Sequence, residues 1–423
     1  MIWTSFTVSD TVTLLKQGID AIVKLWQSFP DAGQIALYAL LVFIMITVVT
    51  KAAVVFMVLL ERKLLAWLTQ RKGPNRVGPL GLGHTIADGV KLLFKEDVMT
   101  DCQDKFLFTI APTLFFLPVF ALVGFLPFSD SLLAAVVPSG MLFLFALSSI
   151  SVVGVVLAGW SSNNKYSLLG GMRSAAQAIS YEIPLILSVL ALAIFSGSLD
   201  IAQVVKQQQA WGAGSWNIIW LLPTFLIFFV SAIAEINRVP FDLPEAESEL
   251  VSGYNTEYSG MKFAMFFLAE YAALFVMAGL MTSFFLGGYG CPFGFWMADV
   301  IGPTLEKTLN LPSLTGLIKQ TEMVVWFITK TYLFIFVIMW IRGTLPRLKP
   351  DQLMGFSWKF LIPLSLINIF VVALQRFVVL NRFQDFGLLI LFVVVAVGGF
   401  WGFARLSSNL LNSQILKRLT AGR

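Results

Sequence analysis

The sequence predicts an all-α integral membrane protein with about nine transmembrane helices plus amphipathic helices on the cytoplasmic side. Hydrophobic residues make up 57% of the 423 residues and charged residues only 13%, whereas soluble domains carry about 25% charged residues. Apolar runs of membrane-spanning length recur along the chain. They lie near 34–60, 106–128, 139–160, 174–197, 216–236, 262–286, 323–341, 359–380 and 386–403. Because lipid satisfies no open backbone groups, these runs must be helical.

The positions of the basic residues predict the orientation of the spans. Twenty of the 29 Lys and Arg residues lie in segments on one side of the predicted membrane. These segments are 61–105, 161–173, 237–262, 342–359 and 404–423. The positive-inside rule therefore places the N-terminus outside and the C-terminus in the cytoplasm. Residues 1–33 form an N-terminal extension, either an interfacial helix or a continuation of the first span.

The few cysteine and histidine residues argue against a redox centre or metal site in this chain. Only Cys102, Cys291 and His84 are available. An iron–sulfur cluster normally needs four thiolates and a structural zinc needs four ligands. Any redox centre is therefore expected on a partner. We expect no nucleic-acid partner either, because the aromatic residues lie in apolar runs without interleaved basic residues.

The segment 61–105 predicts an amphipathic helix at the cytoplasmic surface. Gly73, Pro74 and Asn75 end a first helix, as such residues usually do. In the next stretch an apolar face (Ile86, Val90, Leu93, Phe94) lies opposite a polar face (His84, Asp88, Lys91, Lys95). A helix of this kind lies in the membrane plane. It is either a passive anchor or one wall of a portal between lipid and a protein cavity.

The segment 235–262 concentrates carboxylates beside the membrane. Pro240 and Pro244 prevent a continuous helix. Five acidic residues face only Arg238 and Lys262 in this segment: Asp242, Glu245, Glu247, Glu249 and Glu257. Crowded carboxylates have raised pKa values when they are partly buried. The segment is either a solvated acidic loop or, as its aromatic and apolar residues indicate, a partly buried one.

Three glutamates lie within predicted spans or at their ends. Glu182 and Glu270 lie inside the fourth and sixth spans, and Glu235 ends the fifth. A charged side chain at the centre of a span costs roughly 2.5–3.5 kcal/mol, and such groups often mark ion or proton routes. The structural alternatives are a buried pair with Lys51 or Lys330, or a protonated side chain hydrogen-bonded to backbone. For Glu235, snorkelling to the interface is a further alternative.

Four stretches of the sequence are similar to one family. They are ERKLLAWLTQRKGPNRVGP with DGVKLLFKED (61–79 and 88–97), GWSSNNKYSLLGGMRSAAQAISYEIPL (159–185), RVPFDLPEAESELVSGYNTEYSGMKFAMFFLAEY (238–271) and RGTLPRLKPDQLMGFSWKFLIPLSLIN (342–368). Together they resemble the membrane subunit at the quinone site of respiratory NADH dehydrogenase, complex I. The resemblance covers residues 34–380, which we expect to form the family's membrane domain. Residues 1–33, the loop 287–322 and an extra C-terminal helix with a basic tail (381–423) exceed the compact members.

The resemblance implies a quinone tunnel, shared with hydrophilic subunits of the peripheral arm and bordered by small membrane subunits and lipid. Quinone would be a substrate at a shared site, while NADH, FMN and iron–sulfur clusters would lie on partner subunits. The expected chamber and entrance residues are Arg62, Trp67, Arg71, Asp88, Arg238, Asp242, Glu245, Glu247, Glu249 and Glu257, with Arg342 and Arg347 as further candidates. Glu182, Glu235 and Glu270 would begin a proton path. No metal site is expected.

Two other functions are also compatible with the sequence. One is the corresponding membrane subunit of a related membrane-bound hydrogenase, although the stretch EAESELVSGYNTEYSGM favours the quinone-linked enzyme. The other is an antiporter-like ion-translocating subunit, for which repeated or interrupted spans would be expected, and the sequence displays neither. A purely structural anchor fits the buried carboxylates poorly. The expected location is a bacterial inner membrane rather than a mitochondrial one.

Overall fold

The structure is a computed structural model that describes residues 31–131, 137–209, 212–243, 251–294, 296–299 and 314–381. By its contacts the chain divides into two units, Met1–Lys51 and Ala52–Arg423, and the candidate site lies in the second. All regular elements of the described ranges are helical. The predictions for residues 1–30 and for the ninth span, 386–403, fall outside these ranges.

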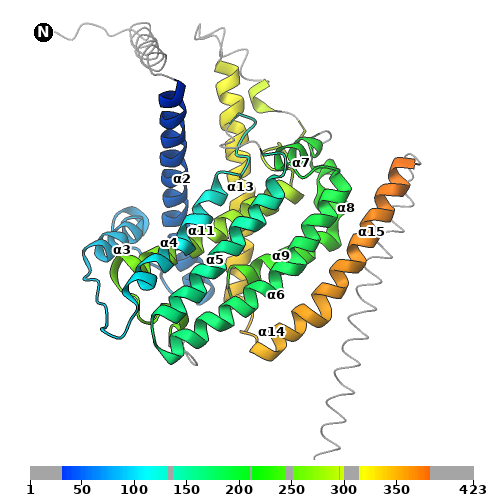
Figure 1. The fold of residues 1–423 in the computed structure, drawn as a ribbon. Coiled ribbons are helices and arrows are strands. Elements are labelled where there is room, and N and C mark those ends of the chain that lie inside the picture. Colours follow the sequence, from blue (N-terminus) through cyan, green and yellow to red (C-terminus); the bar gives the residue numbers. More distant parts are fainter. Residues whose placement is uncertain are drawn as a thin grey trace, which may run out of the picture. The chain divides into compact units, whose positions relative to one another are not determined.

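Six described helices are long and apolar enough to cross a membrane, which supports the predicted fold class but not the count of nine. They are Lys105–Val123, Gly140–Ser161, Lys165–Ser196, Gly260–Phe285, Thr315–Thr344 and Pro350–Arg376. The first four are α4, α5, α6 and α11 (Figure 1). The fifth is α13 (Leu314–Thr344), and the sixth combines α14 (Pro350–Phe356), η4 (Ser357–Leu361) and α15 (Ile362–Asn381). α2 runs from Asp31 to Leu68.

The structure corrects two predicted boundaries. The fourth span was predicted at 174–197, but α6 begins at Lys165, within the segment 161–173 that precedes that span. Asn164 starts the helix because its side-chain oxygen accepts a hydrogen bond from the backbone N–H of Tyr166, as N-cap residues do. The predicted fifth span, 216–236, is interrupted, because Leu221 has non-helical backbone angles between α8 (Asn217–Trp220) and α9 (Leu222–Glu235).

Helices α4, α5 and α6 pack in sequence order, and α6 also contacts α9 and α15 (Figure 1). Close contact between α4 and α5 requires glycine at position 154. A Cβ atom there would lie 2.7 Å from the backbone nitrogen of Phe115. Helices in membranes commonly use such small residues for close backbone contact. α11 packs against both α4 and α13, so it links α13 to the group formed by α4, α5 and α6.

The segment that leads into α11 is folded onto the bundle. The ring of Tyr258 stacks on that of Phe108 at a centroid distance of 4.0 Å, and both residues belong to a buried cluster with Phe115, Tyr254 and Phe266. Burial raises the pKa of the Tyr258 hydroxyl to about 12. Residues 251–259 of the acidic segment are therefore partly buried and do not form a solvated loop.

Gly170 fixes how close this segment lies to α6. A Cβ atom at Gly170 would lie 2.6 Å from the Cα atom of Gly253 in η3 (Gly253–Asn255). Both atoms belong to rigid elements, so the contact can be relieved only by moving backbone.

We expect Gly170→Ala to lower the midpoint of thermal unfolding of the purified protein, because overpacking typically costs about 1–3 kcal/mol. Gly89→Ala is the matched control, since nothing lies within 4 Å of a Cβ atom built there. Equal midpoints for the two variants would show that η3 is free to shift away from α6.

Candidate functional site

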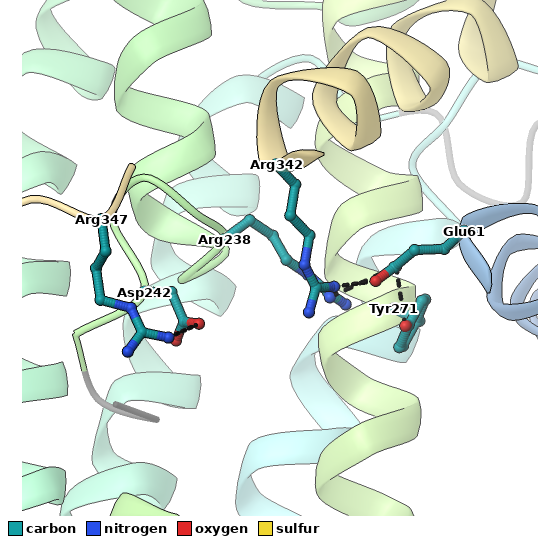
Figure 2. Close-up of polar contacts among 6 residues, drawn as sticks. All are labelled: Glu61, Arg238, Asp242, Tyr271, Arg342 and Arg347. Atoms are coloured by element: carbon teal, nitrogen blue, oxygen red, sulfur yellow. Dashed lines mark hydrogen bonds and ion pairs between the residues drawn. The ribbon is translucent and has the colours of Figure 1, made fainter. Parts of the chain in front are cut away.

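The candidate site is centred on Glu61, near the end of α2. Its side chain is buried, with 5% of the residue exposed. One carboxylate oxygen accepts a hydrogen bond of 2.9 Å from the hydroxyl of Tyr271 on α11, and the other pairs with Arg342 on α13. Arg238 lies 3.6 Å from the first oxygen. Figure 2 shows the two guanidinium groups and the tyrosine hydroxyl around this single carboxylate.

The cluster of Glu61, Arg238, Tyr271 and Arg342, here called the Glu61 cluster, carries a net positive charge. Arg238 is itself buried, with 9% exposed, and its guanidinium lies 4.4 Å from the centre of the Tyr271 ring. The ring face offers the partial negative charge that a desolvated cation favours. One carboxylate and one ring therefore stabilise two cations, which leaves the site suited to an anionic or electron-rich ligand.

A second ion pair extends the site. Arg347 lies 3.0 Å from the carboxylate of Asp242 (Figure 2), and the backbone N–H of Leu348 donates to the carbonyl of Pro240 at 3.0 Å. The turn between α13 and α14 is therefore bound to the start of the acidic segment.

Gln177 holds the same start of the segment against α6. Its side-chain amide nitrogen lies 2.8 Å from the carbonyl of Ala234, 2.7 Å from that of Phe241 and 3.0 Å from the side-chain oxygen of Asn237. The non-helical path from residue 236 to 243 thus has fixed hydrogen-bond partners.

Glu257 and Lys262 of the acidic segment each have a partner outside the segment. Glu257 accepts a hydrogen bond of 2.6 Å from Asn164, and Lys262 pairs with Asp97 at 2.9 Å. These partners are remote in sequence, so the charges within the segment alone did not reveal them. Glu245, Glu247 and Glu249 fall outside the described residues.

The predicted amphipathic helix is α3 (Gly83–Phe94). Its apolar residues Ile86, Val90, Leu93 and Phe94 are exposed. On the other face, Asp88 pairs with Arg62 of α2 at 2.7 Å, with both side chains more than one-third exposed, and lies 3.8 Å from His84. The apolar face is thus turned outward, as a helix in the membrane plane requires.

Two candidate residues are separate from these contacts. Trp67 is 69% exposed, and Arg71 is exposed in the turn that follows α2. Both lie on the surface.

The glutamates in the spans hydrogen-bond to hydroxyl groups. Glu270 accepts a hydrogen bond of 2.7 Å from Tyr254, and Glu182 accepts one from Ser149 of α5. The structural alternative of a buried pair with Lys330 does not apply, because that lysine donates to backbone carbonyls. Among the described residues, the buried Oε2 atom of Glu235 has no hydrogen-bond partner.

Three residues of the site were not expected from the sequence. Glu61 opens one of the motifs and directly follows an apolar run, and its position there was the available signal. Tyr271 also lies in a motif, beside Glu270, but nothing in the sequence pattern distinguishes it. Gln177 is a neutral residue on α6 and gave no signal at all.

The described residues contain no group of three or more His, Cys, Asp or Glu side chains that could hold a metal ion. The arrangement instead provides paired charges, a tyrosine hydroxyl and protonatable carboxyl groups. These groups can bind a polar ligand head and exchange protons with it.

Comparison with known proteins places the chain in a family. The family model described as NADH dehydrogenase matches residues 40–373, and the chain belongs to this family. Among its relatives is the H subunit of the NADH-quinone oxidoreductase of Brevibacillus brevis, 46% identical over 349 residues that cover 82% of this chain and 96% of the relative. The proteins of the same name from Geobacillus thermodenitrificans and Bacillus cytotoxicus are 44% and 45% identical. They align with 83% and 76% of this chain, and with 97% and 89% of their own lengths.

We expect Glu61→Gln to destabilise the protein far more than Asp88→Asn. Removing the carboxylate leaves one buried and one partly buried guanidinium group without their shared anion, and breaking a buried pair in this way costs about 3–5 kcal/mol. The half-exposed pair of Asp88 contributes less than about 1 kcal/mol. The measurement is the midpoint of thermal unfolding of each purified variant. A smaller loss for Glu61→Gln than for Asp88→Asn would contradict the buried charge balance.

Proposed function

We propose that this chain is the quinone-site membrane subunit of a proton-translocating NADH:quinone oxidoreductase. The observation that carries the proposal is the buried Glu61 cluster, placed where α2, α11 and α13 meet. Its surplus of positive charge suits a quinone head group, whose reduction places negative charge on the ring oxygens. The names of the relatives from three bacteria support the same activity.

The chemistry of quinone explains why protonatable groups surround the site. Reduction of a quinone takes two electrons and two protons, so charge appears briefly on the ring. In a low-dielectric site that charge shifts the pKa values of nearby carboxyl groups strongly. Closely spaced acids then titrate as a coupled set. Under this proposal the chain couples electron transfer on its partners to proton movement, and carries no redox centre.

The proposed entrance to the tunnel lies at α3. Its exposed apolar face would contact lipid, while the Arg62–Asp88 pair on its other face connects it to α2. Trp67 and Arg71 would border the entrance from the surface. A long apolar quinone tail would then enter past α3 while its head group reaches the Glu61 cluster.

The chamber wall would be formed by Arg238, Asp242, Arg342 and Arg347 with the acidic segment. Three of the residues expected there, Glu245, Glu247 and Glu249, stay a prediction from the resemblance, and Glu257 is proposed through its contact with Asn164.

The proposed proton path begins at Glu270, Glu235 and Glu182. Each of the outer two has a hydroxyl partner, Tyr254 and Ser149 respectively. A carboxyl group with a hydroxyl partner can both accept and donate a proton, which a carboxylate locked to a lysine cannot easily do.

The proposed location is a bacterial inner membrane, with the N-terminus outside and the C-terminus in the cytoplasm. The partners would be the hydrophilic quinone-site subunits, small membrane subunits, lipid and quinone, with NADH, FMN and iron–sulfur clusters on those partners. We assign residues 34–380 to the family's membrane domain, and treat 1–33 and 381–423 as additions. The span interrupted at Leu221 is a feature that transporters also have. The family match to residues 40–373 nevertheless favours the quinone-linked enzyme.

Purification from the membrane tests the assignment as a whole. A complex that contains this chain with flavin, and that reduces quinone with NADH, is expected. A complex with nickel and hydrogenase activity would contradict the proposal.

We expect Arg62→Ala and Asp88→Asn to lower kcat/KM for a long-tail quinone by up to about fivefold, the effect of a half-exposed ion pair. A quinone with a truncated tail should be affected less, because it does not need the same entrance. Lys72→Ala is the matched control, since Lys72 is an exposed cation in the turn beside Arg71. Equal losses for the two quinones, or losses as large in the control, would argue against an entrance at α3.

We expect Glu182→Gln and Glu270→Gln to lower quinone reduction and proton pumping together, on the order of 10²-fold, because positioned groups that transfer protons contribute effects of this size. NADH oxidation with an artificial acceptor should not change, since flavin chemistry lies on a partner. Glu96→Gln serves as the control, because Glu96 is exposed outside the spans. Pumping at the normal rate and stoichiometry in assembled Gln variants would exclude these two residues from the path.

A further inference from the structure

Lys330 is a buried cation at the far end of α11 from the Glu61 cluster. Only 6% of the residue is exposed. Its ammonium nitrogen, Nζ, donates to the carbonyl oxygens of Leu286, Gly288 and Gly290 at 2.7, 3.0 and 2.6 Å. An ammonium group has three N–H donors, so these three carbonyls satisfy all of them.

Two glycines shape the turn that presents these carbonyls. Gly287 and Gly288 have φ angles of +68° and +52°, in the left-handed region that glycine adopts without penalty. A Cβ atom at Gly288 would lie 2.8 Å from the side chain of Val205, and one at Gly287 would lie 2.9 Å from the indole nitrogen of Trp216. The turn therefore depends on glycine both for its angles and for its space.

The site is built from dipoles and an aromatic face. Nζ lies 4.6 Å from the centre of the Trp216 ring, a favourable distance for a cation over a π-system. Among the described residues, the ionisable side chain that interacts with Lys330 is the thiol of Cys291, and not a carboxylate. The C-terminal end of α11 adds the negative end of a helix dipole, which also favours a cation.

The neighbouring carbonyls of α11 are already occupied, which isolates this cation site. Gln208 donates to the carbonyl of Ser283 at 3.1 Å, and Asn217 donates to that of Phe284 at 2.9 Å. The carbonyls of Leu286, Gly288 and Gly290 thus remain for a cation. In the described residues, the cation that these three carbonyls bind is the ammonium group of Lys330.

We infer that the turn 286–290 and Trp216 form a binding site for a monovalent primary ammonium ion, which the chain itself fills with Lys330. The ligand class follows from three convergent carbonyl oxygens, the face of the Trp216 ring and a surrounding in which no described carboxylate interacts with the cation. We call the three carbonyls of the turn and the Trp216 ring the ammonium cage. Shortening Lys330 to alanine should leave this cage vacant, so that it accepts methylammonium with the methyl group where the lysine side chain was. The bound cation holds the turn after α11 against α13.

Cys291 reports whether the cage is closed. It follows directly on Gly290 and is buried, whereas Cys102 is exposed. In the purified complex, the rate of maleimide labelling at each cysteine can be followed by mass spectrometry of the corresponding peptides. We expect Lys330→Ala to speed labelling of Cys291 by at least roughly tenfold, because all three hydrogen bonds of a charged group are lost and one alone has this effect on a local opening equilibrium. Labelling of Cys102 should not change.

Methylammonium should restore the protection of Cys291 in Lys330→Ala, and tetramethylammonium should not, because it has no N–H donors. Lys319→Ala is the matched control. Lys319 also lies on α13, 5.7 Å from the Trp296 ring, but it pairs with the carboxylate of Asp299 at 3.1 Å. In Lys319→Ala, Cys291 should be labelled as slowly as in the native chain, and methylammonium should not change that rate.

Two results would overturn the assignment. One is an assembled Lys330→Ala complex in which methylammonium gives no more protection than tetramethylammonium. The other uses Lys330→Met, which fills much of the same volume without donors and serves if the alanine variant fails to assemble. Protection of Cys291 by methionine as complete as by lysine would show that the turn needs no cation.

Discussion

The carboxylate of Glu61 holds together parts of the chain that are far apart in sequence. Its partners Tyr271 and Arg342 lie 210 and 281 residues away, on two other helices. Each guanidinium in the Glu61 cluster is buried or partly buried, so neither is fully stabilised by water. Because a buried charge without a partner is costly, the positions of α2, α11 and α13 at this point depend on the one carboxylate they share.

The same constraint explains how the segment before α11 is positioned. Arg238, at the start of that segment, is held by the Glu61 cluster, while Asp242 is held by Arg347. Gly170 then allows η3 to lie directly on α6. A segment with proline and many acidic residues is thus held near both ends by contacts to helices, and Tyr254 near its end donates a hydrogen bond to Glu270. Lys330 stabilises the opposite end of α11 in a different way, with carbonyl dipoles in place of a carboxylate.

The hydropathy pattern predicted the helical membrane class, and the periodicity of residues 83–94 predicted α3 with its correct faces. Glu182 and Glu270 were recognisable because an acid in an apolar span is costly. Their hydroxyl partners were not, since Ser149 and Tyr254 are ordinary residues 33 and 16 positions away. The ion pairs of Arg238 and Arg347 likewise depend on tertiary packing. The predicted start of the fourth span at 174 was too late, because the hydropathy of the polar stretch before it does not reveal the cap at Asn164. The interruption at Leu221 was missed because it lies in an uninterrupted apolar run and appears only in the backbone angles.

The central claim is that Glu61 and Arg342 act as one buried unit at the quinone-binding wall. A double-mutant cycle tests it most directly, with kcat/KM for quinone and the thermal midpoint measured for Glu61→Gln, Arg342→Gln and the double variant. Contacting residues in one network couple by about 0.5–3 kcal/mol, so the double variant should be no worse than Glu61→Gln alone in either measurement. Losses that add in the double variant would show that the two residues act independently, and would contradict the account.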